Sequence, residues 1–129
     1  MSAAQELRMV IAVDDFDKVV RFYRDVVGLD VDSEWDRDDG RGVLFDAGKA
    51  TLEVFDRKQK ESNDEFEAGR VIEGDVRMAL KVDDVDSTFH TLVVDGAPLM
   101  AHPIDAPWGH RLARLTTPHG MQLTLFSDI

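Results

Sequence analysis

The chain has no cysteine, little proline and no long hydrophobic run. Its 129 residues include no cysteines and four prolines. Without cysteine there are no disulfides and no thiolate metal ligands, which is compatible with a cytoplasmic location. No apolar run approaches the roughly 20 residues of a membrane span, and residues 1–6 lack the basic and apolar regions of a secretion signal. We therefore expect a cytoplasmic protein with no membrane segment.

Positive charge is also scarce. There are 15 lysines and arginines against 26 aspartates and glutamates, which gives a formal net charge of −11 at pH 7. This balance argues against nucleic acid and anionic membranes as partners, because both attract basic patches. A hydrophobic fraction of 43% is ordinary for a globular protein of this length. The composition thus predicts one compact domain, or two small modules that share a core.

One ten-residue pattern occurs twice, 69 positions apart. Residues 8–17 read RMVIAVDDFD, and residues 77–86 read RMALKVDDVD. Each copy is a strand pattern followed by an acidic helix start, where aspartates can accept hydrogen bonds from the first helical N–H groups. A long internal period indicates a repeat architecture. The sequence therefore predicts two copies of one module.

The hydrophobic periodicity predicts the same order of elements in both halves, one strand and one helix followed by three strands. For the first module the predicted elements are a strand at 7–13, a helix at 15–27 ended by Gly28, and strands at 29–35, 43–47 and 50–55. For the second they are a strand at 76–82, a helix at 84–94, and strands at 99–104, 111–116 and 121–126. We assign residues 1–56 and 76–129 to the two modules of one structural domain. The polar segment 57–75 is predicted to be a linker.

Three further segments carry a family resemblance. They are FYRDVVGL at 22–29, PWGHR at 107–111 and TPHGMQL at 117–123. In this element order the chain resembles the vicinal oxygen chelate superfamily, which includes glyoxalase I, bleomycin-resistance proteins, fosfomycin-resistance enzymes and extradiol dioxygenases. The resemblance spans residues 7–126. It implies an α+β fold of two repeated βαβββ modules, each a curved mixed sheet with one helix, that together enclose a cavity.

The resemblance also implies where metal ligands would lie: at the start of the first strand and in the last strand of each module. Those positions hold Arg8, Glu53, Arg77 and Thr124 here. Period-2 alternation places all four on the face opposite the helices. A guanidinium only donates hydrogen bonds and repels cations, so we expect no metal and no cofactor at these positions.

Two interpretations of Arg8 and Arg77 follow from this placement. They can pair with Glu53 and simply close the cavity, or they can clamp a carboxylate or phosphate of a ligand by charge-assisted hydrogen bonds. A register slip of one residue would turn Met9 and Met78 inward instead and remove both interpretations.

Aromatic residues supply the predicted cavity wall, namely Trp35, Phe45, Trp108 and His110. Trp108 has an alternative place at a subunit interface, where tryptophan is enriched. His102 and His110 flank one hairpin, so a rearranged metal site between them stays open as an alternative.

The function that these features predict is metal-independent binding or sequestration of a small, partly aromatic molecule by a homodimer. The alternative is a glyoxalase- or dioxygenase-type enzyme, with a rearranged metal site or with Glu53 as the acid–base group. A third class is a regulatory or structural dimer whose cavity has collapsed. The sequence does not define the charge of the ligand: the acidic balance favours a cation and the two arginines favour an anion.

Overall fold

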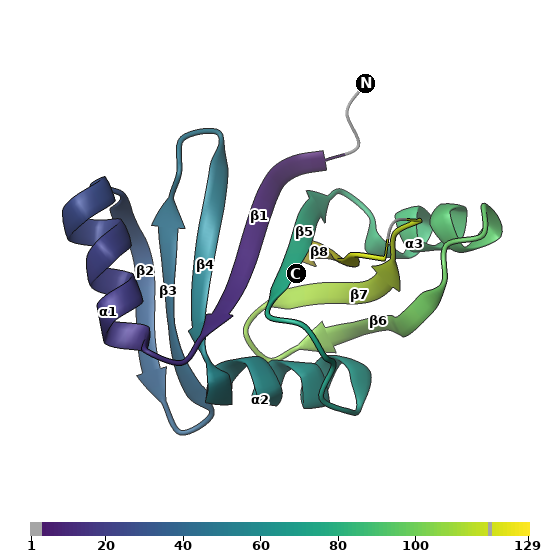
Figure 1. Cartoon of the computed structure of the whole chain (residues 1–129). Coiled ribbons are helices and arrows are strands. Elements are labelled where there is room, and N and C mark those ends of the chain that lie inside the picture. Colours follow the sequence, from purple (N-terminus) through teal and green to yellow (C-terminus); the bar gives the residue numbers. More distant parts are fainter. Residues whose placement is uncertain (1–3, 119) are drawn as a thin grey trace.

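Eight strands form one continuous, curved sheet in the computed structural model, which describes residues 4–118 and 120–129 (Figure 1). The strand order is β2-β3-β4-β1-β5-β8-β7-β6. The first four strands are β1 (Ala4–Val13), β2 (Asp30–Arg37), β3 (Gly40–Asp46) and β4 (Ala50–Asp56). The second four are β5 (Val76–Val82), β6 (Leu99–Ala106), β7 (His110–Thr116) and β8 (Gln122–Asp128). This is the predicted α+β fold of two βαβββ modules.

The two modules meet through their repeated first strands. β1 and β5 pair antiparallel, with Met9 opposite Met78 and Arg8 opposite Ala79. Each first strand also pairs in parallel with the last strand of its own module, β1 with β4 and β5 with β8. Both modules of the sheet therefore come from one chain.

Each module buries one face of its sheet under its own helix. In the first module α1 (Phe16–Arg21) covers a core of Phe16, Val20, Val43, Phe45 and Val54. In the second, α3 (Val85–Val94) covers a core that includes Val85, Phe89, Ala113, Leu115 and Leu125. Ile11 and Val13 pack on the α1 side, whereas Arg8 and Val10 face the cavity. The predicted alternation of β1 is confirmed, and the one-residue slip does not occur.

The prediction that Phe45 lines the cavity is wrong. Its side chain is fully buried in the core under α1, 6.2 Å from the ring of Tyr23. Val43 and Phe45 share one face of β3 because side chains alternate along a strand, and Leu44 faces the cavity in their place. The aromatic character of Phe45 suggested a wall position, but the phase of the strand decides its face.

The first helix also differs from the prediction of one helix over 15–27. α1 ends at Arg21 and continues as the π-helix η1 (Phe22–Val27), before Gly28 ends it with a positive φ of 87°. A π-turn shifts the following residues away from the 3.6-residue period of an α-helix, and Val27 in this turn is 51% exposed. The predicted aspartate cap is present only in the second module, where Asp84 accepts a hydrogen bond from the Ser87 N–H at 3.1 Å. Asp15 makes no such side-chain bond.

The segment predicted as a linker contains a third helix, α2 (Arg57–Ala68). Figure 1 shows α2 running below the sheet from the first module towards the second. Arg114 of β7 anchors it to the second module through buried bonds to Asp64 at 2.8 Å and Glu67 at 2.9 Å. On the side of the first module, α2 packs directly against Gly40 of β3. A larger residue would not fit at this position, because a Cβ there would lie 2.3 Å from the backbone nitrogen of Gln59.

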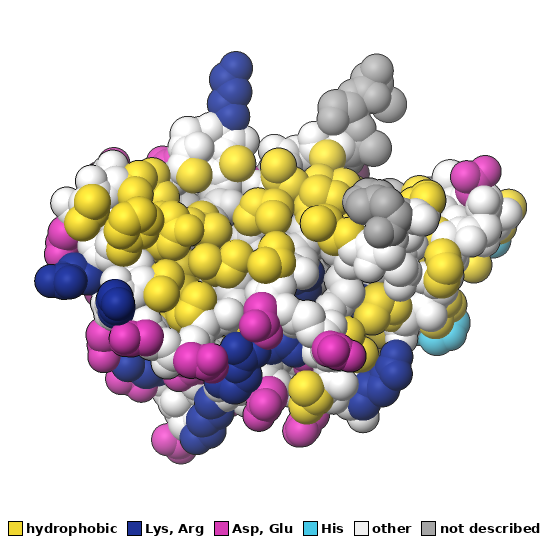
Figure 2. Space-filling view, viewed as in Figure 1, with side chains coloured by type: hydrophobic (Ala, Val, Ile, Leu, Met, Phe, Trp, Pro, Cys, Tyr) yellow, Lys and Arg dark blue, Asp and Glu magenta, His cyan; other side chains and the backbone are white. Residues whose placement is uncertain are grey.

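The surface carries both charged and apolar regions. Figure 2 shows acidic and basic side chains along the side that carries α2, and hydrophobic side chains gathered over the face above it. The large exposed apolar residues of β1, η1 and β2 are Leu7, Phe22, Val26, Val27 and Val31. Within residues 4–118 and 120–129, no helix has the length and apolar character of a membrane span.

Candidate functional site

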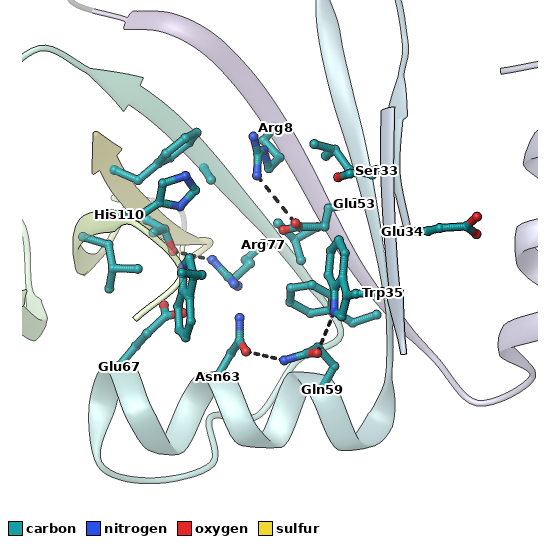
Figure 3. A pocket seen from close by; sticks show the side chains of 18 of the residues that line it. Arg8, Ser33, Glu34, Trp35, Glu53, Gln59, Asn63, Glu67, Arg77 and His110 are labelled. Atoms are coloured by element: carbon teal, nitrogen blue, oxygen red, sulfur yellow. Dashed lines mark hydrogen bonds and ion pairs between the residues drawn. The ribbon is translucent and has the colours of Figure 1, made fainter. Parts of the chain in front are cut away.

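A cavity of about 410 Å³ lies between the two modules, with α2 at its base (Figure 3). Its volume is in the range of small-molecule sites. The aromatic residues that line it are Trp35, Phe55, Trp108, His110 and Phe126. The polar residues at its centre and base are Arg8, Glu53, Gln59, Asn63, Glu67, Arg77 and Thr124.

The four positions that match metal ligands in the family come together in this cavity. Val10 lies opposite Glu53 in the β1–β4 pair, and Ala79 lies opposite Thr124 in the equivalent β5–β8 pair. Arg8 and Arg77 project into the same space. The sequence located these residues correctly, and whether they bind a ligand stays a prediction.

Arg8 is held by carboxylates. One guanidinium nitrogen lies 3.0 Å from Glu6 and another lies 3.5 Å from Glu53. Its guanidinium carbon also lies 4.9 Å from the centre of the Phe126 ring, in cation–π geometry. Most of its donors are occupied, so Arg8 matches the interpretation in which an arginine neutralises Glu53.

Arg77, the repeat equivalent of Arg8, has different neighbours. It donates a hydrogen bond of 2.6 Å to the Thr124 hydroxyl. In the described part of the chain it forms no ion pair within 4.0 Å. Burial lowers the pKa of Arg77 below its ordinary value, although Glu67 and Glu53 act in the opposite direction. The Arg77 guanidinium therefore has further N–H groups that can donate hydrogen bonds to a ligand in the cavity.

Glu53 is a carboxyl group in an environment that disfavours its charge. Its side chain is only 13% exposed, and burial raises its pKa above the ordinary value although Arg8 and Arg77 lie nearby. A carboxyl group in this state is easier to protonate than one in water.

His110 lies in the cavity and His102 does not. The His110 ring is 5.1 Å from Phe126, and burial together with the charge of Arg8 lowers its pKa, which favours a neutral imidazole. The His102 ring instead packs 5.8 Å from Phe89, which belongs to the core under α3. The two rings lie on opposite faces of the sheet, so the alternative of a metal held by both is wrong.

The residues at the four metal-ligand positions do not fit a divalent cation. Two of the four are guanidinium groups, and the Thr124 oxygen already accepts a hydrogen bond from one of them. Glu53 alone would have to hold the ion. Across the described ranges, no cluster of three or more histidine, aspartate or glutamate side chains has metal-binding geometry.

The aromatic walls are fixed by specific contacts. The Trp35 indole packs so closely on β3 that a Cβ at Gly42 would lie 2.0 Å from the ring. Its N–H donates to the side-chain oxygen of Gln59 at 2.7 Å. Trp108 is 38% exposed, and its ring lies 5.4 Å from Phe66 of α2. The contact places Trp108 between the cavity and the outer surface of α2.

Sequence reasoning missed the base of the cavity. Gln59, Asn63 and Glu67 lie on one face of α2 at intervals of four residues, and all three line the cavity. The available signal was Asp56 followed by Gln59, the spacing of a helix N-terminus, since Asp56 accepts a hydrogen bond from the Gln59 N–H at 2.7 Å. The low apolar content of residues 57–75 obscured it.

Comparisons with known proteins agree with this architecture. A sequence of 31% identity over 117 residues, covering 87% of this chain and 89% of its own length, is the uncharacterized protein YraH of Bacillus subtilis (strain 168). Methylmalonyl-CoA epimerase from Mycobacterium tuberculosis has a similar fold, with a TM-score of 0.72, 20% identity, and coverage of 100% of this chain and 91% of its own. A hypothetical protein from Bacillus halodurans C-125 also has a TM-score of 0.72, at 16% identity, with coverage of 95% and 92%.

The match to a family extends over nearly the whole chain. The sequence model of the Glyoxalase/Bleomycin resistance protein/Dioxygenase superfamily aligns with residues 7–125. This range contains all four repeat-equivalent cavity positions and both tryptophans of the cavity wall. The chain belongs to the Glyoxalase/Bleomycin resistance protein/Dioxygenase superfamily.

Proposed function

We propose that this protein binds a small, partly aromatic molecule in the cavity between its modules and that it does so without a metal ion. The observation that supports this most directly is the cavity itself, about 410 Å³ with aromatic residues from both modules in its wall. Such a site needs only apolar walls and a few convergent polar groups to hold a ligand. Trp35 and Trp108 provide large flat faces for stacking.

A titration with aromatic probes tests the proposal. Both tryptophans of the chain line the cavity, so intrinsic fluorescence reports on its occupancy. We expect one- and two-ring aromatic probes such as 2-naphthamide to bind with one-to-one stoichiometry by calorimetry. Ser33→Trp, at an exposed cavity-lining position of β2, should reduce binding by narrowing the cavity. Asp32→Trp, on the same strand but outside the cavity lining, is the matched control.

The metal-independent part has its own test. Protein purified without added metal should contain no stoichiometric zinc, nickel, iron or manganese by elemental analysis, because guanidinium groups occupy two of the four ligand positions. About one such ion per chain would refute this part of the proposal. Binding of the aromatic probe should also be insensitive to a chelator.

The environment of Glu53 supports a second candidate function, that of a superfamily enzyme that uses acid–base chemistry. The supporting observation is a carboxyl group in the cavity whose pKa burial raises, the direction expected of a carboxyl group that acts as an acid or base. Proton exchange at the methylene of phenylpyruvate in D₂O, followed by NMR, tests it. Catalysed exchange that Glu53→Gln abolishes would support the enzyme. Exchange at the rate of buffer alone would leave binding as the function.

We also propose a homodimer as the assembly. The exposed apolar side chains of β1, η1 and β2 provide a surface that a second copy can cover (Figure 2). Within one chain, residues of both modules line the cavity. Light scattering at micromolar concentration should give twice the monomer mass, and a monomer mass for the folded protein would refute the dimer.

A further inference from the structure

A chain of three side chains runs from the cavity wall to its base in a fixed direction. The Trp35 indole N–H donates to the oxygen of Gln59 at 2.7 Å. The Gln59 amide nitrogen then donates to the oxygen of Asn63, also at 2.7 Å. Figure 3 shows both bonds crossing the base of the cavity.

The direction of this chain is set by chemistry. An indole N–H can only donate, so the Gln59 amide must turn its oxygen to Trp35 and its nitrogen to Asn63. Asn63 must then turn its own oxygen to Gln59, because two amide nitrogens would both present hydrogens. Gln59 is 3% exposed, which leaves little room for water to satisfy another orientation. The free end of the chain is therefore the NH₂ group of Asn63.

This NH₂ group meets a second donor. Figure 3 shows the Asn63 nitrogen turned towards the guanidinium of Arg77. Neither group can accept a hydrogen bond from the other. Arg77 has one partner, Thr124, and no carboxylate within 4.0 Å among residues 4–118 and 120–129. Two donors face one space and share no acceptor.

The nearby cations have carboxylate partners already, although the buried Nη2 of Arg114 makes no hydrogen bond to the described residues. Arg8 pairs with Glu6 and Glu53, and Arg114 pairs with Asp64 and Glu67. An acceptor placed between Asn63 and Arg77 would thus meet the cation of the cavity that lacks a carboxylate. A carboxylate has two oxygens with the geometry to accept from both groups at once.

We propose that Asn63 and Arg77 form a carboxylate subsite at the base of the cavity, with Asn63 oriented by Trp35 through Gln59. The inference rests on the proposed function and defines its ligand class: an aromatic molecule that carries a carboxylate. The aromatic part stacks on the walls while the carboxylate points to α2. Trp35 has two roles here, a wall for the ring and the donor that sets the polarity of the subsite.

The test compares 2-naphthoate with 2-naphthamide, which have the same ring and nearly the same shape. Calorimetry on the wild type should show the acid binding about 10- to 100-fold more tightly, the range of a charge-assisted hydrogen bond. Equal affinities for the two would overturn the subsite while leaving the aromatic cavity intact. If neither probe binds, the proposed function fails together with the subsite.

Gln59→Glu then tests the polarity without removing either donor. A glutamate accepts from both neighbours, so Asn63 would turn its NH₂ group to residue 59 and its oxygen to Arg77. The acid should lose its advantage over the amide, and Asn63→Asp should have the same result by pairing with Arg77. Lys58→Gln removes one positive charge from an exposed position of α2 and should keep the preference. A preference that survives in both Gln59→Glu and Asn63→Asp would overturn the inference.

Discussion

Arg8 and Arg77 occupy equivalent positions in the two modules, yet their surroundings differ. Arg8 lies between two carboxylates, Glu6 and Glu53, and over the Phe126 ring. Arg77 has the Thr124 hydroxyl as its partner. The difference follows from the last strands, since β4 supplies a glutamate where β8 supplies a threonine. Two identical residues in a repeated frame can thus have different surroundings, one paired with carboxylates and the other bonded to a hydroxyl.

The largest effect should come from removing the paired arginine. Arg8→Met leaves Glu6 and Glu53 partly buried without their cation, and we expect the free energy of unfolding to fall by about 2–3 kcal/mol. Arg77→Met should change it by less than about 1 kcal/mol, because Arg77 leaves no carboxylate behind. Urea unfolding at pH 7 measures both. Arg24→Met is the exposed control and should cost under about 0.5 kcal/mol. Equal losses at Arg8 and Arg77 would abolish the distinction.

Ligand affinity should show the opposite order. Arg77→Met should weaken binding of 2-naphthoate by about 2 kcal/mol, through loss of a charge-assisted hydrogen bond. Arg8→Met should weaken it less, because the donors of Arg8 are used within the protein. Calorimetric titration of both variants, under conditions where circular dichroism shows them folded, gives the comparison. A stronger effect at Arg8 would reverse the assignment of roles.

A double substitution sharpens the structural role of Arg8. Adding Glu53→Gln to Arg8→Met removes one of the two unpaired carboxylates, so about 1 kcal/mol of the lost stability should return. The same addition to Arg77→Met should return nothing, since no ion pair was broken. Unfolding free energies of the four proteins in each cycle give the two coupling energies. Coupling of equal size in both cycles would contradict the structure.

The smallest effect concerns pH. Burial raises the pKa of Glu53 in the folded protein above 4.5, its ordinary value. The folded state therefore holds this proton more tightly, and the stabilisation is complete below about pH 4.5 and is lost as pH rises through the folded pKa. Glu53→Gln should gain stability relative to the wild type over this window.

The measured quantity is the difference in unfolding free energy between the wild type and Glu53→Gln, because Glu6 titrates in the opposite sense and its contribution cancels in the difference. Its bonds from Thr51 and Arg8 outweigh burial and lower its pKa, so its contribution is lost as pH falls. The other charged groups near Glu53 are Arg8, Arg77 and Glu67. Chemical denaturation between pH 4 and pH 7 gives the difference. A difference independent of pH would show that Glu53 is not perturbed.

The fold followed from the sequence because its main signals are periodic and repeated. The pattern of residues 8–17 and 77–86 predicted two strands, which the structure pairs with each other where the modules meet. Alternation correctly placed Arg8, Glu53, Arg77 and Thr124 on the face opposite the helices. Family resemblance contributed the curvature of the sheet and the existence of the cavity, which no local pattern encodes.

The candidate site was predicted less completely. α2 was missed because its cavity-facing residues are Gln59, Asn63 and Glu67, whose burial depends on hydrogen bonds and ion pairs with distant strands. Hydrophobic periodicity cannot detect such a helix. The prediction for Phe45 failed for the opposite reason. Its aromatic character is a strong signal, but the face of the sheet on which its side chain lies depends on the phase of alternation along β3.

Helix α2 also affects how a ligand can enter and lie. Two copies of one module create an approximate internal symmetry, and in a symmetric site a ligand could bind equally well in either of two opposed poses. α2 comes from the segment between the copies, and it lies at one end of the cavity (Figure 3). The two ends are therefore chemically distinct, with amide and guanidinium donors at one end. The site therefore has a direction that two symmetric modules alone would lack, and it can distinguish the two ends of an elongated ligand.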